Sequence, residues 1–77
     1  MTELEWLSKF GENLSQLLKN ARMSQIELAN VVGLSKSAIN NYIHGRQMPT
    51  IRAVINICYE LGCDTDELID FNERIIK

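Results

Sequence analysis

The chain has 77 residues, of which 45% are hydrophobic and 23% are charged, and its formal net charge at pH 7 is −2. This length allows one small domain with a single core, and the composition is too apolar for an intrinsically disordered protein. The sequence has neither the basic start and apolar run of a signal peptide nor about 18 consecutive apolar residues for a membrane span, so we expect a cytoplasmic protein without a membrane partner.

Apolar residues recur at spacings of three and four throughout, and no segment alternates as a strand does, which predicts an all-α fold. Thr2 followed by Glu5 has the pattern of a capping box and predicts the start of the first helix. Gly11 is expected to weaken or bend the start of this helix. The residues expected on its buried face are Phe10, Leu14, Leu17, Leu18 and Ala21.

Two further helices are predicted on either side of a glycine. Ser24 with Glu27 forms a second capping box. Gly33 is expected to end this helix, because glycine adopts the left-handed conformation without the steric penalty of a Cβ. Ser35 then caps a third helix, from residue 36 to about residue 44, and the next glycine ends it. The expected buried residues of the second helix are Leu28, Ala29 and Val32.

The C-terminal part of the chain predicts two more helices. Thr50 is expected to cap a fourth helix that ends at Gly62, and Asp64 with Glu67 predicts a short fifth helix. No repeat or linker divides the chain, so residues 1–77 are expected to form a single domain. The residues expected to be buried are Val54, Ile55, Cys58 and Leu61 in the fourth helix and Leu68 and Ile69 in the fifth.

The third predicted helix has one polar and one apolar face. At about 100° per residue, five polar residues fall within an arc of roughly 140°, and four apolar residues occupy the opposite side. Asparagine and serine are mediocre helix formers, so a surface that needed only solubility would favour other residues. The polar face therefore fits hydrogen bonding to a partner. Its residues are Lys36, Ser37, Asn40, Asn41 and His44, and the apolar residues are Ala38, Ile39, Tyr42 and Ile43.

The chemistry of this face fits the major groove of DNA, where asparagine can read adenine, lysine can read guanine and serine can read several bases. Two helices joined by a tight glycine-containing turn form a helix-turn-helix, whose second helix enters that groove. Ser24 and Gln25, at the start of the supporting helix, could bind phosphate with the help of the helix dipole. Lys19, Arg22 and Arg52 are expected to be ordinary surface charges, and His44 is expected to interact with the end of the third helix.

The charge distribution agrees with this interpretation. The net charge of −2 taken alone speaks against a nucleic-acid partner, because phosphate neutralisation drives such binding. However, residues 14–52 carry five cations and one anion, whereas residues 53–77 carry six anions and two cations. The central segment is therefore the expected anion-binding surface, and the acidic end is expected to repel anions.

The stretch QIELANVVGLSKSAINNYI, residues 25–43, resembles the helix-turn-helix of the Cro and cI-type repressors, also called the XRE family. Flanking segments extend the resemblance to about residues 10–70 and imply a compact five-helix, lambda-repressor-like DNA-binding domain. Many members carry a tryptophan-glutamate pair where this chain has Tyr42 and Ile43, so the hydrogen bond made by that glutamate is not expected here.

The resemblance implies a sequence-specific transcriptional regulator of double-stranded DNA, most simply a repressor. One module buries only about 600–1,000 Å² on DNA, so we expect a homodimer on a palindromic operator. The residues implied as base contacts are Lys36, Ser37, Asn40 and Asn41, and those implied as phosphate contacts are Ser24, Gln25, Arg46, Gln47 and Thr50. In the tail at 71–77, Phe71, Ile75 and Ile76 either cover the core or form the dimer contact.

An alternative hypothesis is a protein-interaction module, such as an antitoxin or adaptor, which the acidic C-terminal third would favour. An enzyme is not expected, because the sequence has no nucleophile motif, phosphate loop or cluster of metal ligands. Cys58 and Cys63 are separated by four residues and lie far from the only histidine, so we interpret them as structural thiols without metal or cofactor. Leu4, Trp6 and Phe10 are expected in the core or in a flap over it, with no ligand pocket.

Overall fold

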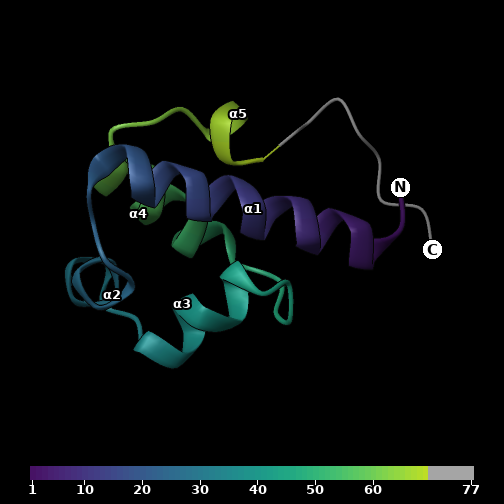
Figure 1. Cartoon of the computed structure of the whole chain (residues 1–77), viewed down its shortest axis with the longest axis horizontal. Coiled ribbons are helices and arrows are strands. Elements are labelled where there is room, and N and C mark those ends of the chain that lie inside the picture. Colours follow the sequence, from purple (N-terminus) through teal and green to yellow (C-terminus); the bar gives the residue numbers. More distant parts are fainter. Residues whose placement is uncertain (70–77) are drawn as a thin grey trace.

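The computed structural model describes residues 1–69, which form five α-helices and no strand. In Figure 1, α1 crosses the molecule, α2 and α3 lie on one side of it, α5 lies on the other side and α4 lies behind. This arrangement confirms the predicted all-α, five-helix fold. None of the described helices combines the length and the apolar content needed to cross a membrane. The helices are α1 (Glu3–Ala21), α2 (Gln25–Val32), α3 (Lys36–Ile43), α4 (Ile51–Leu61) and α5 (Thr65–Leu68).

Short polar side chains begin the first four helices, as predicted. Each of these side chains accepts a hydrogen bond at 3.0–3.1 Å from the backbone N–H three residues later. In α1 and α2, a glutamate three residues after the cap also accepts from the backbone N–H of the cap, which completes two capping boxes. The helix starts are therefore set by local sequence. The capping residues are Thr2, Ser24, Ser35 and Thr50.

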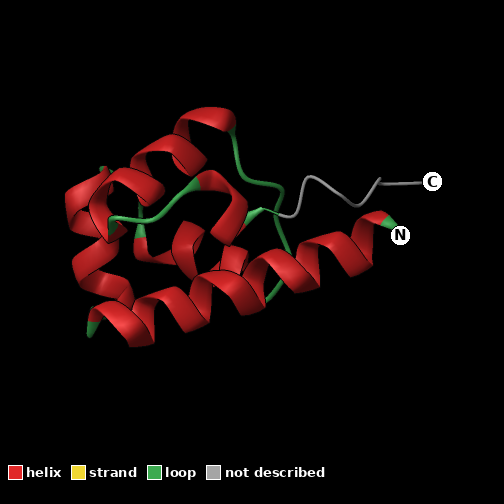
Figure 2. Ribbon diagram, turned by 90° about the horizontal axis from the view of Figure 1, so that it is seen from above, coloured by secondary structure: helices red, strands yellow, loops and turns green. Residues whose placement is uncertain are grey.

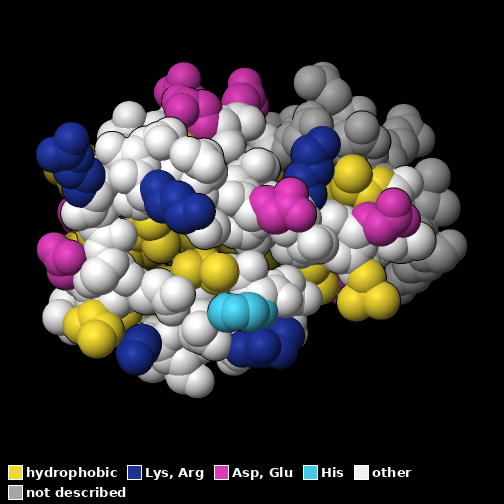
Figure 3. Space-filling model, in the orientation of Figure 1, with side chains coloured by type: hydrophobic (Ala, Val, Ile, Leu, Met, Phe, Trp, Pro, Cys, Tyr) yellow, Lys and Arg dark blue, Asp and Glu magenta, His cyan; other side chains and the backbone are white. Residues whose placement is uncertain are grey.

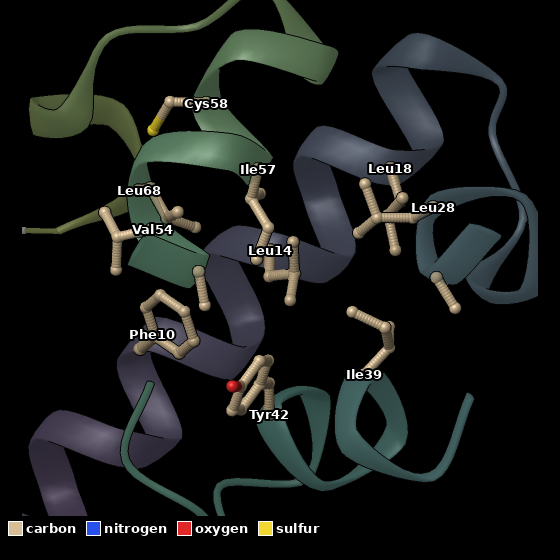
Figure 4. Close-up of a cluster of buried hydrophobic side chains, with 12 residues drawn as sticks. Phe10, Leu14, Leu18, Leu28, Ile39, Tyr42, Val54, Ile57, Cys58 and Leu68 are labelled. Atoms are coloured by element: carbon tan, nitrogen blue, oxygen red, sulfur yellow. The ribbon is translucent and has the colours of Figure 1, made fainter. Parts of the chain in front are cut away.

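Every helix contributes to one hydrophobic core (Figure 4). In α1, Phe10 stacks on Trp6 with ring centroids 5.6 Å apart, and its ring lies 6.0 Å from that of Tyr42 in an edge-on arrangement. Leu68 anchors α5 to this core and is fully buried. The largest fully buried side chains are Phe10, Leu14, Leu28, Ile39, Ile57 and Leu68.

Three residues predicted to be buried are exposed. Ile55 is 55% exposed because the buried side of α4, which includes Val54 and Ile57, is centred about 130° away from it around the helix. Leu4 is 76% exposed, since the first turns of α1 extend beyond the other helices (Figure 2). Ala21 is exposed in the last turn of α1. The spacing of apolar residues predicts these helices correctly. Which apolar side chains are buried depends on the elements that pack against each helix.

Gly11 permits a close approach between α1 and the end of α3. The helix continues without interruption through this residue, which is buried. A Cβ built on Gly11 would lie 2.7 Å from the carbonyl oxygen of Tyr42 and closer still to that of Ile43. Gly11 therefore allows α3 to pack closely against α1. The prediction that it weakens or bends the start of α1 is wrong, because the helix is continuous there.

Substitution of Gly11 by alanine tests this contact. Alanine gains about 1 kcal/mol of helix propensity, but its methyl group would collide with backbone that cannot move alone. We expect Gly11→Ala to lower the free energy of unfolding by about 1–3 kcal/mol, as measured by urea denaturation. Glu12→Ala, at the next and exposed position, should change it by less than about 0.5 kcal/mol. A Gly11→Ala protein as stable as the wild type would contradict the close helix contact.

The two cysteines are free thiols, Cys58 buried and Cys63 partly buried. Burial, assisted by a hydrogen bond with Cys63, raises the pKa of Cys58 to about 12. At pH 8 the Cys58 side chain is therefore almost entirely protonated. Because the thiolate is the nucleophile, we expect Cys58 to react slowly in the native protein.

Alkylation measures this protection directly. At pH 8 we expect iodoacetamide to modify Cys58 at least about 100-fold more slowly in the native protein than in urea, since only the unfolded chain has an ordinary thiolate fraction. Peptide mass spectrometry would distinguish Cys58 from Cys63. Equal rates of Cys58 modification in the two states would show that the core around α4 is open.

Candidate nucleic-acid interface

The turn between α2 and α3 sets the geometry of the site. Gly33 ends α2 in the left-handed conformation, with φ of 71°, and Leu34 N–H then donates to the carbonyl oxygen of Ala29 at 3.0 Å. Ser35 caps α3 immediately afterwards. The chain therefore forms two helices joined by a tight turn, as the sequence predicts for a helix-turn-helix.

The buried side of α3 holds its polar side outward. Ile39 and Tyr42 are buried in the core, and the carbonyl oxygens at the end of the helix meet α1 at Gly11. Lys36 and Ser37, in the first turn, are exposed. The fully buried residues thus lie on the predicted apolar face, whereas Asn40 and Asn41 of the polar face are half-buried.

Arg46 links two of the predicted base-contacting residues. Its Nη2 donates to Oδ1 of Asn40 at 2.7 Å, and its Nε donates to Oδ1 of Asn41 at 3.2 Å. The asparagine Nδ2 groups donate in turn to Gln25 Oε1 at 3.3 Å and to Gln47 Oε1 at 3.4 Å. Five residues from α2, α3 and the following loop thus form one hydrogen-bonded network, which we call the amide network.

The amide network determines what the asparagines can offer to a partner. Bidentate recognition of adenine uses both the oxygen and the nitrogen of a carboxamide. In the free protein both Oδ1 atoms accept from Arg46, whereas each NH₂ group has a second hydrogen available. Each carboxamide therefore offers one free N–H, and its oxygen keeps one lone pair beside the guanidinium group of Arg46.

The other predicted phosphate contacts lie at helix starts. Ser24 and Thr50 accept from backbone amides within α2 and α4, so their hydroxyl hydrogens remain as donors. Both residues are exposed at the positive ends of helix dipoles.

Lys36 and Ser37 lie at the opposite end of α3 from Arg46 and are outside the amide network. His44 follows α3, and its Nδ1 lies 2.9 Å from the carbonyl oxygen of Asn40, in agreement with its predicted position.

Lys19 and Arg22, predicted to be ordinary surface charges, are exposed and lie beside the predicted phosphate contacts. A shallow hollow between the end of α1 and the start of α2 is lined by Lys19 and Arg22 together with Ser24 and Gln25. Arg22 ends α1 with φ of 54°, without a glycine that would have signalled the turn. Arg22 is only two residues from Ser24 in the sequence, and this short separation could have predicted that Arg22 lies beside the start of α2.

Figure 3 shows the histidine and lysine or arginine side chains along the edge that carries α3, and acidic side chains over α5 at the opposite edge. Side chains of both charges also lie over the rest of this face. The described residues contain no group of three or more histidine, cysteine or acidic side chains placed to hold a metal. The predicted dimerisation residues Phe71, Ile75 and Ile76 lie outside residues 1–69.

Comparisons with known proteins agree with this geometry. The curated relative YqaE of Bacillus subtilis (strain 168), an uncharacterised HTH-type transcriptional regulator, is 29% identical over 70 residues. These residues are 88% of this chain and 60% of YqaE, so the chain spans about three fifths of that relative.

Solved structures share the fold. The restriction-modification controller protein C.AhdI from Aeromonas hydrophila matches with a TM-score of 0.78 and 27% identity, over 82% of this chain and 96% of C.AhdI. An HTH_3 family transcriptional regulator from Vibrio cholerae matches with a TM-score of 0.80 and 24% identity, over 87% of this chain and 38% of that protein. The model of the helix-turn-helix family HTH_3 matches residues 14–68, which confirms the resemblance to the XRE family. The chain therefore belongs to the helix-turn-helix family HTH_3.

Proposed function

We propose that this chain is a sequence-specific DNA-binding transcriptional regulator that places α3 in the major groove. The observation that carries the proposal is the polar face of α3, exposed at Lys36 and Ser37 and half-buried at the two asparagines. This face is held outward by the buried side chains of Ile39 and Tyr42. Membership of a helix-turn-helix family and the transcriptional regulators among its relatives support the same function. We further propose that it represses transcription.

Base reading is assigned to the side chains that α3 presents. Lys36 and Ser37, in its first turn, would reach base edges directly, because the start of a recognition helix enters the groove first. Asn40 and Asn41 would contribute their free N–H groups, which suit acceptors such as guanine O6 and N7 or thymine O4.

Phosphate binding is assigned to residues around this helix. Gln25, Arg46 and Gln47 border the face through the amide network, and Ser24 and Thr50 lie at the N-terminal ends of α2 and α4. Helix N-termini attract phosphate through unpaired N–H groups and the helix dipole. Because one such module is small, two copies would bind a palindromic operator as a homodimer.

The competing hypothesis of a protein-interaction module has some support in the acidic surface at α5, where Asp64, Asp66 and Glu67 are exposed. That surface lies away from α3 (Figure 3). It does not account for an outward face of lysine, serine and two asparagines, which is why DNA binding is the stronger proposal.

The dependence of affinity on salt distinguishes these functions. If Arg46 neutralises a phosphate, Arg46→Ala should lower the slope of log K against log salt by about 0.9, as measured by fluorescence anisotropy on duplex DNA. Lys9→Ala removes the same charge beside Leu68 and Ile69, away from α3, and should leave the slope unchanged. A flat salt response of the wild-type protein would favour a protein partner.

Substitution of Asn41 tests base reading separately from phosphate binding. We expect Asn41→Ala to relax the preference at particular base pairs by about 1–3 kcal/mol, as determined by random-duplex selection and competition binding. Asn20→Ala, an exposed amide on α1, is the matched control and should preserve the selected motif. An equal loss of affinity on random and selected DNA would contradict the role of Asn41.

A further inference from the structure

The loop after α3 places one guanidinium group beside both asparagines of the polar face. Gly45 has a φ of 68°, and a Cβ built on it would lie 3.2 Å from the backbone nitrogen of Ser8. The loop therefore turns in the left-handed conformation directly against α1. The backbone N–H of Arg46 then donates to the carbonyl oxygen of Asn41 at 2.8 Å. The backbone at Arg46 is thus held by α1 and α3, independently of its side chain.

The side chain of Arg46 determines which way each carboxamide points. A guanidinium group donates hydrogen bonds and accepts none, so the asparagine atom that faces it must be the oxygen. Its Nη2 lies 2.7 Å from Oδ1 of Asn40, as in a charge-assisted bond, and its Nε lies 3.2 Å from Oδ1 of Asn41. A flip of either carboxamide would set an NH₂ group against N–H donors. Arg46 therefore holds both amides in one orientation.

The two glutamines of the amide network do not hold that orientation by themselves. The bonds that they accept from the asparagine Nδ2 atoms are 3.3 Å long at Gln25 and 3.4 Å long at Gln47, which is longer than the usual range. A glutamine carboxamide also carries both a donor and an acceptor, so it can rotate to suit a flipped asparagine. A guanidinium group has no acceptor to offer. The orientation of the asparagines therefore depends on Arg46.

This orientation matters for base recognition because bases differ in where their donors and acceptors lie. In the major groove guanine presents two acceptors, cytosine presents a donor, and adenine presents one of each. An asparagine whose oxygen is held at Arg46 directs its free N–H to a fixed place. A flipped asparagine would direct an oxygen there instead, and would favour a different base.

We propose that Arg46 is a positioning residue for base recognition, which fixes the carboxamides of Asn40 and Asn41 and so determines the base preference of α3. The inference rests on the proposed function, in which α3 reads bases, and it gives Arg46 a role beyond phosphate binding. The two roles are compatible, since the bonds to the asparagines use two of the five N–H donors of the guanidinium group. The remaining donors are left for a phosphate.

Arg46→Lys separates the two roles, because lysine keeps the charge but replaces a fixed fork of donors by one rotatable ammonium group. We expect random-duplex selection with this variant to show at least about a threefold weaker preference at the base pairs that Asn40→Ala and Asn41→Ala each relax. The slope of log K against log salt should stay within about 0.3 of the wild-type value. Arg52→Lys makes the same change at an exposed arginine outside the amide network, and should reproduce the wild-type motif. An unchanged motif in Arg46→Lys would overturn the proposal.

A double-mutant cycle tests whether Arg46 acts through the asparagines. At the base pair that Asn41 reads, Arg46→Lys should weaken the preference at least about threefold in the wild-type background and less than about 1.5-fold in the Asn41→Ala background. The same comparison applies to Asn40→Ala at its own base pair. Equal effects in both backgrounds would mean that Arg46 contacts the base directly, which contradicts a positioning role.

Hydrogen exchange measured by nuclear magnetic resonance tests the contact without DNA. In the free protein the Nε–H of Arg46 should exchange with solvent at least about fivefold more slowly than that of Arg52, because it donates to Asn41. Asn41→Ala should abolish this difference, whereas Asn20→Ala should preserve it. Equal exchange of the two arginines in the wild type would show that Arg46 does not hold Asn41.

The outcomes for this proposal and for the proposed function are distinct. A wild-type motif that Arg46→Lys leaves unchanged would overturn the positioning role alone. The absence of any selected motif with the wild type would overturn the proposed function, and hydrogen exchange would still decide whether Arg46 orients the asparagines.

Discussion

The contact between the backbones of α1 and α3 constrains the rest of the structure. Gly11 allows the carbonyl oxygens at the end of α3 to approach α1, and Ile39 and Tyr42 anchor the same helix in the core. A rotation of α3 by one residue, about 100°, would bury carboxamides and expose apolar side chains. The rotation of α3 is thus fixed by packing on the side opposite to the proposed DNA surface.

Features that depend on neighbours in sequence were predictable. The residues that cap the first four helices, the glycine at the turn and the two faces of α3 follow from local hydrogen bonding and from helical period. Burial was less predictable, because it depends on what lies opposite a helix. Ile55 fits the apolar pattern of α4 and is nevertheless exposed, whereas Ile57 faces the core.

The amide network could not be predicted from sequence. Arg46 follows a reversal of the chain at Gly45, and only that loop conformation returns its guanidinium group to residues five and six positions earlier. The role of Gly11 was equally hidden, since a glycine in a helix has the same local signature whether it bends the helix or admits another backbone. Both features are tertiary contacts between segments whose relative placement local patterns do not specify.

The acidic side chains over α5 have a consequence for the way this domain would approach DNA. The cations along the α3 edge and the acidic side chains over α5 are two regions of opposite charge, and together they contribute a dipole that points through α3 (Figure 3). Near a polyanion such a dipole experiences a torque, so that repulsion turns the acidic end away before any contact forms. The acidic residues that give the chain its net negative charge would therefore reduce the time that the domain needs to turn α3 toward DNA.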